Sequence, residues 1–197
     1  MPIALKSPWL ARMFLALAVT GSMASALRAQ DGEPANLALN KPATISSTSR
    51  WTTTLHPTGA NDGNVKKDFG FHTSDKGTQW WKVDLQEVKE VGMIKVYNRG
   101  DGYQDRAKNL KVSYSLDDKT YTAIPRPDDG KAFDTLTLNI NNGQGVKARY
   151  IKVELNDGNP LHLAQVEVLE KLQMKAVDPS ALGIGPGSMP SNPFGNM

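Results

Sequence analysis

Short runs of alternating apolar and polar residues, separated by turn sequences, dominate the middle of this chain. Clusters of turn-forming residues occur at 61–64, 99–102, 116–119, 128–130, 141–143 and 156–160. Between them lie strand-like runs at 91–97, 110–115, 133–140, 150–155 and 164–169. No segment between residues 36 and 170 shows a long helical period. The pattern therefore predicts an all-β fold, an antiparallel β-sandwich or jelly roll, with Trp80-Trp81 opening a core strand.

Composition removes several classes of function. The chain has 197 residues and no cysteine, which excludes a disulfide framework, a thiolate metal site and a cysteine nucleophile. The net charge of +3 falls to +1 without the first 26 residues, because that segment holds Lys6 and Arg12 and no acidic residue. A nearly neutral domain with interspersed charges gives no electrostatic reason to expect nucleic acid as a partner.

The ends of the chain differ from its middle. Residues 1–26 combine Lys6 and Arg12, an apolar run and the small residues Ala24-Ser25-Ala26, as in a cleavable signal peptide. The apolar run is short for a retained membrane anchor, the alternative reading. We expect a linker at 27–35, one domain at 36–170 and a disordered Pro/Gly-rich tail at 171–197. Export without cysteines predicts a secreted, periplasmic or cell-surface protein of bacterial type, with no membrane span after cleavage.

A basic cluster near the middle of the chain carries the strongest chemical signal. His72 precedes two strand-like runs, and Arg99, Asp101 and Arg106 follow the second of them. Arginine offers a planar set of N–H donors, and a histidine ring nitrogen either donates or accepts. Such a group suits a neutral ligand rich in hydroxyls, and a sugar with vicinal hydroxyls is the expected guest.

An enzyme is the rival class. The chain contains no Gly-x-Ser-x-Gly, His-Glu-x-x-His or phosphate-loop motif. The paired carboxylates Asp117-Asp118 and Asp128-Asp129 lie in turn sequences, where a solvated turn is the default interpretation. We therefore predict no catalysis.

Five segments together resemble a known superfamily. They are 36–44, 61–64, 80–85, 148–153 and 163–168. These stretches look like the galactose-binding-like β-sandwich, which includes the coagulation factor V/VIII C-type (discoidin) domains, bacterial carbohydrate-binding modules and the F-type lectins, or fucolectins. The likeness spans 36–170, and it implies a galactose-binding-like jelly roll.

Within that scaffold, the spacing of His72, Arg99, Asp101 and Arg106 resembles the F-type lectin signature for L-fucose. The resemblance implies that His72, Arg99 and Arg106 donate hydrogen bonds to the ring oxygen and to the 3- and 4-hydroxyls, while Asp101 fixes the guanidiniums. Many animal members have adjacent cysteines after the Arg-Gly-Asp, where this chain has Gly102-Tyr103. Tyr103 is a candidate for an apolar ring face against the sugar in their place. Phe71, Trp51 and His56, from the upstream loops, are candidates for the apolar pocket that the C6 methyl of fucose needs.

The superfamily resemblance also implies a structural calcium ion. Asp62 and Asn64 match the turn that supplies its ligands, and Gln165 stands where glutamate is usual. Glutamine keeps an oxygen but removes a charge, so we expect Ca²⁺ binding of reduced affinity. The alternative is that 61–64 is only a turn.

Other interpretations stay open at this point. Arg99 and Arg106 could pair with Asp101 and Asp105 in a surface ion cluster. His162 is expected to serve packing. A discoidin-type adhesion module that binds a galactose-type glycan, a protein or a lipid surface is the alternative to a fucose lectin, whose partners would be fucosylated glycans. One shallow sugar site binds weakly, so self-association into a homo-oligomer is a reasonable expectation.

Overall fold

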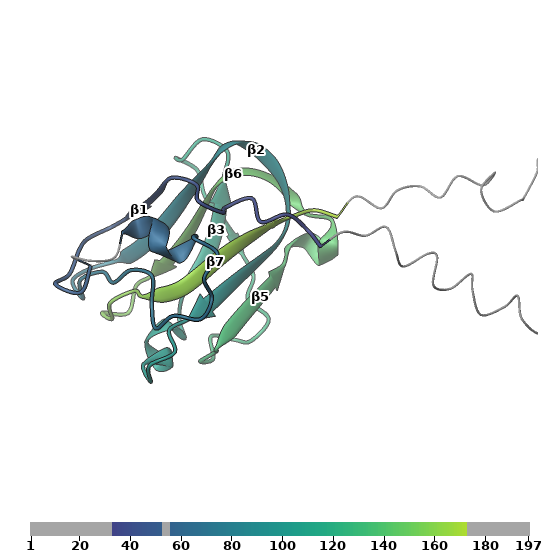
Figure 1. Cartoon of the computed structure of the whole chain (residues 1–197). Helices are drawn as coiled ribbons and strands as arrows, with labels where there is room; N and C mark the ends of the chain where they lie inside the picture. The colour runs from purple at the N-terminus through teal and green to yellow at the C-terminus, as the bar shows by residue number, and fades with distance from the viewer. Residues whose placement is uncertain (1–32, 53–55, 173–197) are drawn as a thin grey trace, which may run out of the picture.

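The computed structural model describes residues 33–52 and 56–172, and these form an antiparallel β fold (Figure 1). The strands are β1 (Ala43–Ile45), β2 (Gln79–Asn98), β3 (Lys111–Ser115), β4 (Thr122–Ile124), β5 (Thr135–Asn139), β6 (Val146–Leu155) and β7 (Leu163–Glu170). Three short 3₁₀ turns are η1 (Pro57–Ala60), η2 (Gln104–Ala107) and η3 (Ile140–Gly143). The predicted all-β class is confirmed, and each predicted strand lies within or overlaps an observed one.

Strand β2 organises the sandwich because its two halves belong to different layers. Its first half pairs with β1 and β6, and β6 leads on to β3 and β4. Its second half pairs with β5 and β7. The register with β6 shifts between Asp84 and Lys89, where Gln86 has a φ of +73°, and Figure 1 shows the strand arching over at this bend. The sequence pattern suggested two separate strands here, around Trp80-Trp81 and at 91–97.

The core fills the space between the layers. Trp81 is fully buried, stacks on Phe71 with ring centroids 6.5 Å apart, and donates from its indole nitrogen to the carbonyl of Pro57 at 2.9 Å. Trp80, its neighbour on the other face of the strand, is only half-buried. The first half of β2 and the second half of β6 alternate as expected for inward and outward faces, whereas β7 is buried along nearly its whole length.

The two ends of the described chain lie together at one end of the sandwich, where the Glu170 amide donates to the Ala35 carbonyl at 2.9 Å. The predicted signal peptide and almost all of the predicted tail fall outside the described residues. Within residues 33–52 and 56–172, no helix is long and apolar enough to cross a membrane.

Candidate functional site

The loop after β2 carries both arginines of the predicted cluster. Strand β2 ends at Asn98, whose side-chain amide donates to the carbonyls of Gln104 at 3.0 Å and Phe133 at 2.9 Å. These bonds close the loop that begins with Arg99 and lead it into η2, which bears Arg106. Gly102, with a φ of +96°, supplies the left-handed conformation that this tight turn requires.

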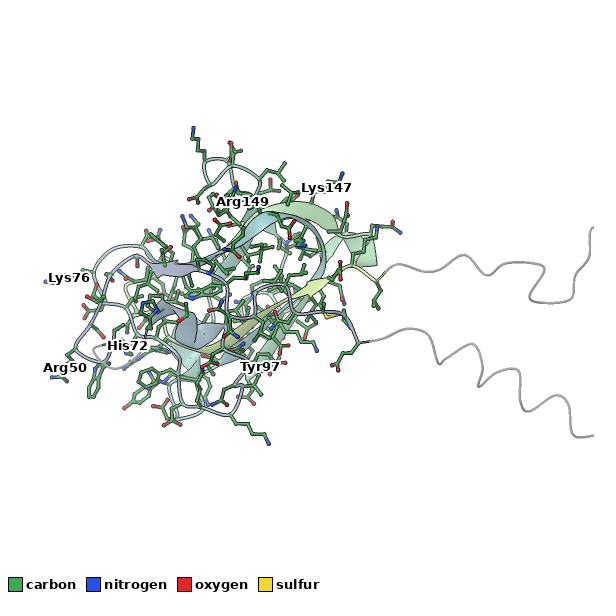
Figure 2. All side chains as sticks on the ribbon, turned by 45° about the horizontal axis from the view of Figure 1, so that its top comes forward. Arg50, His72, Lys76, Tyr97, Lys147 and Arg149 are labelled. Carbon is green, nitrogen blue, oxygen red and sulfur yellow. The ribbon has the colours of Figure 1, made fainter. Side chains whose placement is uncertain are left out.

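His72 reaches the same end of the sandwich on a different segment. The chain at 70–73 lies beside the start of β7 and the residues just before it, with Gly70 N donating to Leu163 O at 2.7 Å and Thr73 N to Leu161 O at 3.0 Å. Figure 2 shows His72 and Arg50 at one end of the sandwich, far from Lys147 at the other. Segments distant in sequence thus bring His72 to the loop that carries the arginines.

A pocket of about 420 Å³ opens between these segments. Its walls are Arg50, Trp51, Phe69, His72, Arg99, Asp101, Tyr103 and Arg106. The pocket combines charged donors with aromatic faces, and Trp51 and Tyr103 are about half exposed at its mouth. Its volume lies at the lower end of the range for small-molecule sites.

Both guanidiniums lie close to the ring of Tyr103. The Arg99 Cζ is 4.8 Å and the Arg106 Cζ 4.3 Å from its centroid, and Arg99 also lies 4.9 Å from the centroid of Phe69. Arg99 donates from Nε and Nη2 to the two carboxylate oxygens of Asp101, which leaves Nη1 for a ligand. These hydrogen bonds, and the charge of Arg99, hold the pKa of Asp101 below its ordinary value against the effect of burial.

The expected ion cluster forms only in part. Arg99 pairs with Asp101 as predicted, and Arg99 is 5% exposed. Arg106 has no carboxylate partner among the residues that the structure describes, and it contacts Tyr103 instead. Its N–H donors are therefore available to a guest in the pocket.

His72 presents an acceptor to the pocket. Its Nδ1 donates to the Thr73 carbonyl at 2.8 Å, so Nε2 of the neutral ring carries the lone pair. Burial and the nearby charges of Arg99 and Arg106 lower the pKa of His72 below 6.5, which keeps the ring neutral at pH 7. The backbone thus holds the Nδ1 proton, and the donor role that the family resemblance implies for His72 would require a proton on Nε2 as well.

Two aromatic assignments also change. Phe71 is completely buried against Trp81 and does not line the pocket. Phe69, two residues earlier, lines it and contacts the His72 ring edge-on at a centroid distance of 5.7 Å. His56 accepts a hydrogen bond from Thr58 N at the start of η1, away from the pocket walls. Phe69 and Phe71 are two phenylalanines only two residues apart. The sequence alone does not show which of them lines the pocket and which lies in the core.

The three residues predicted to bind calcium do lie near one another, but one oxygen of each already accepts from a nitrogen donor. Lys67 Nζ lies 2.7 Å from the Asp62 carboxylate, and the Asn64 side-chain oxygen accepts from Lys66 N at 3.0 Å. The buried Gln165 amide is satisfied when its NH₂ group faces Asp62. Calcium takes six to eight oxygen ligands and gains from carboxylates, so this set does not fit the ion.

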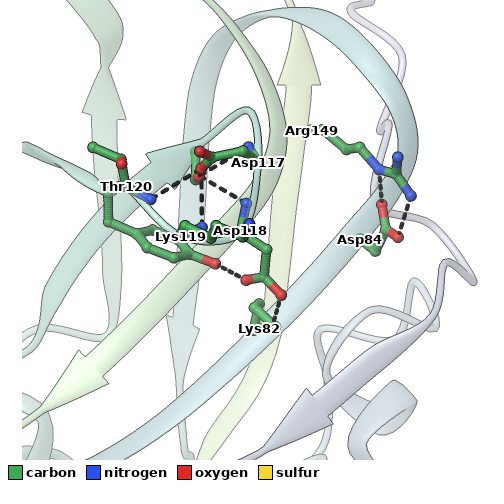
Figure 3. Close-up of polar contacts among 9 residues, drawn as sticks. Lys82, Asp84, Asp117, Asp118, Lys119, Thr120 and Arg149 are labelled. Atoms are coloured by element: carbon green, nitrogen blue, oxygen red, sulfur yellow. Dashed lines mark hydrogen bonds and ion pairs between the residues drawn. The ribbon is translucent and has the colours of Figure 1, made fainter.

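The paired carboxylates serve the turns in which they lie (Figure 3). Asp117 accepts from the backbone amides of Lys119 and Thr120, both at 2.9 Å, and Asp118 pairs with Lys82 at 2.5 Å. A separate bidentate pair joins Asp84 to Arg149 at 2.8 and 2.9 Å. Each of these carboxylates is matched by donors that stabilise the fold.

Comparison with known proteins places the fold in a family. The sequence profile of the F5/8 type C domain matches residues 42–167. Fucolectin-6 of Anguilla japonica is 27% identical over 143 residues, which cover 68% of this chain and 74% of that protein. The lectin domain of lectinolysin, solved in complex with Lewis B antigen, is 36% identical with a TM-score of 0.59, covering 71% of this chain and 99% of that one. A fucose binding module of Streptococcus pneumoniae is 33% identical with a TM-score of 0.60, covering 70% and 96%. The chain therefore belongs to the F5/8 type C domain family, in which it groups with the fucolectins, or F-type lectins.

Proposed function

We propose that this domain is a non-catalytic lectin that binds terminal L-fucose in the pocket formed by His72, Arg99 and Arg106. The convergence of these three side chains from separate segments in one pocket carries the proposal. The relatives support it, since one is a fucose binding module and another was solved with a Lewis B antigen. Fucosylated glycans are displayed outside cells, which agrees with the leader-like sequence at residues 1–26.

The pocket suits a neutral polyol better than an anion. Asp101 occupies the Nε and Nη2 edge of Arg99, the edge that would otherwise grip a carboxylate or sulfate in a bidentate manner. Arg99 is left with single N–H donors, which match hydroxyl oxygens. The carboxylate also balances one of the positive charges beside the ligand.

Each polar group then has a separate role with vicinal hydroxyls. Arg106 and Arg99 Nη1 donate to hydroxyl oxygens, and one of those hydroxyls donates in turn to His72 Nε2. A hydroxyl that accepts a hydrogen bond from a guanidinium group becomes a better hydrogen-bond donor, so each bond in the series strengthens the next. Phe69, Trp51 and Tyr103 supply apolar surface for the methyl group and ring face of a deoxy sugar.

A calorimetric titration of the protein with three monosaccharides tests this function. We expect L-fucose to bind with one site and a Kd on the order of 10 µM to 1 mM, as is usual where little apolar area is buried. L-galactose, which differs only by a hydroxyl on C6, should bind roughly tenfold or more weakly because that hydroxyl enters an apolar region. D-galactose tests the alternative of a galactose-type module, and preference for it over L-fucose would refute the proposal.

Avidity would require several sites. One shallow pocket per chain gives weak attachment to a glycan surface, and we propose that self-association or clustering on a partner multiplies it.

The proposed role of His72 predicts a pH dependence of fucose binding. Because the pKa of His72 lies below 6.5, its acceptor is present at pH 7 and above and is lost as the pH falls through that pKa. Protonation also places a third positive charge beside Arg99 and Arg106. We expect affinity to be constant above pH 7 and to fall about tenfold per pH unit well below the pKa.

Titrations at pH values from 8 to 4.5 measure this profile. A His72→Asn variant keeps a side-chain acceptor without a titrating ring, so its weaker binding should be nearly independent of pH. An affinity that increases on acidification would show that His72 acts as a cationic donor instead.

A further inference from the structure

Several oxygen atoms gather in a ring where η1 meets β7, and nitrogen donors of the chain itself bind them. At the end of η1, the Gly59 carbonyl accepts from Lys67, while the Ala60 carbonyl and the Asp62 carboxylate face Gln165 of β7. Gly59 has to be glycine here, because a Cβ atom would lie 2.3 Å from the Gly70 carbonyl oxygen. This close crossing brings the carbonyl groups of the turn to one point.

Lys67 supplies the positive charge at that point. Its ammonium group donates to the Gly59 carbonyl and lies 2.7 Å from Asp62 Oδ1, and its side chain is only 17% exposed. Although burial acts to raise it, the pKa of Asp62 is lowered, chiefly by the hydrogen bond to Lys67 and by that from the Asn64 amide. The carboxylate is therefore ionised and paired.

Gln165 completes the ring in a way that glutamate could not. With its amide oriented to satisfy all three contacts, the NH₂ group donates to Ala60 O at 3.2 Å and to Asp62 Oδ1 at 3.3 Å, while its oxygen accepts from Gly63 N at 3.0 Å. A carboxylate has no N–H to offer. It would also add a second negative charge beside Asp62, which a single ammonium group could not balance.

We propose that Lys67 and Gln165 together take the place of a divalent cation, so that this domain folds without calcium. Two carboxylates and one Ca²⁺ are neutral, and so are one carboxylate, one amide and one ammonium group. The exchange keeps the local charge while replacing metal–oxygen bonds by N–H···O hydrogen bonds. Binding of Ca²⁺ would require the ammonium group to leave its two oxygens.

Thermal unfolding of the full chain tests the proposal independently of sugar binding. We expect the same Tm, to within about 1 °C, in 2 mM CaCl₂ and in 2 mM EDTA, because a ligand that does not bind cannot shift the equilibrium. Lys67→Ala leaves Asp62 and the Gly59 carbonyl without their donor, and should lower the Tm by roughly 5 °C. Lys66→Ala, a change at the exposed neighbouring lysine, is the matched control and should leave the Tm within about 1 °C.

A double variant, Lys67→Ala with Gln165→Glu, tests the idea of exchange directly. It restores two facing carboxylates and removes the competing ammonium group, so its Tm should be low in EDTA and rise by several degrees with millimolar Ca²⁺. A Tm of the unaltered protein that drops in EDTA would overturn the proposal. The proposal would also be overturned if Lys67→Ala were as stable as Lys66→Ala, or if the Tm of the double variant were the same with and without Ca²⁺.

Discussion

Arg106→Ala is expected to weaken L-fucose binding about 10- to 150-fold while leaving the fold intact. Hydrogen bonds from a charged group to a neutral hydroxyl contribute about 1.5–3 kcal/mol each, and 1.4 kcal/mol corresponds to a tenfold change in Kd. Arg106 contacts Tyr103 and has no carboxylate partner among the described residues, so its removal leaves no charge unpaired. Calorimetric titration measures the loss, and circular dichroism checks the β signal.

Arg99→Ala should have a larger effect on binding, about 100-fold or more. It removes a donor and also leaves the Asp101 carboxylate facing the ligand without its partner. Arg99→Lys restores a charge but cannot reproduce the two parallel bonds to Asp101, and should recover only part of the affinity.

Arg126 offers a matched control for Arg99. Its Nε and Nη2 bind the two oxygens of Asp128 at 2.8 and 2.6 Å, in the same Arg-x-Asp spacing as Arg99 and Asp101. Its other donors are taken by backbone carbonyls, those of Lys108 at 2.5 Å, Leu110 at 3.2 Å and Lys131 at 3.0 Å. Arg126→Ala should therefore lower stability and leave fucose affinity unchanged. Equal losses of affinity at Arg99 and Arg126 would contradict the assigned site, as would full binding by Arg106→Ala.

His162 is expected to make the domain sensitive to acid. This histidine is completely buried beside His72, at a centroid distance of 5.2 Å, and its two ring nitrogens have no hydrogen-bond partner among the described residues. Burial, with the positive charge of Arg99 and the proximity of His72, lowers the pKa of His162 to about 3.

The effect on stability follows from that depressed pKa. The unfolded chain binds a proton at this histidine near pH 6.5 and the folded chain only near pH 3, so stability is full above pH 6.5 and is lost as the pH falls toward 3. At pH 4.5 the loss is about 3 kcal/mol, since each pH unit corresponds to 1.36 kcal/mol. Urea unfolding at pH 7.5, 6, 5 and 4.5 measures this loss.

A His162→Leu variant separates this residue from the others. It should be as stable as the unaltered protein at pH 7.5, or more stable by about 1 kcal/mol, because two unsatisfied buried nitrogens disappear. Its loss of stability on acidification should be much smaller, although His72 still contributes. His56→Ala, a change at an exposed histidine, should keep the acid sensitivity of the unaltered protein. If His162→Leu loses stability as steeply as the unaltered protein, another group is responsible.

Local patterns in the sequence were sufficient to predict the class of fold. Period-2 alternation and turn residues act over a few positions, and they located the runs that became β3, β5, β6 and β7. The spacing of His72, Arg99 and Arg106 likewise predicted a cluster that the folded chain does bring into one pocket. The continuity of β2 through its bend at Asp84–Lys89 was missed, because charged residues there interrupt the alternation and only pairing with β6 carries the strand onward.

The sequence by itself determined the strands, the turns and the residue types available for binding. Only the tertiary structure decided which atoms of those residues remain for a ligand. It placed Phe69 in the pocket and Phe71 in the core, and it saturated Arg126 with carbonyls while leaving Nη1 of Arg99 for a guest. It also placed the Lys67 ammonium group against the Asp62 carboxylate, which the sequence had predicted to bind calcium, and against the Gly59 carbonyl. The physical reason is that groups outside a motif occupy its donors or cover its rings, and no local pattern records their approach. Trp81 covers Phe71 in this way, and the carbonyls of Lys108 and Leu110 occupy Arg126.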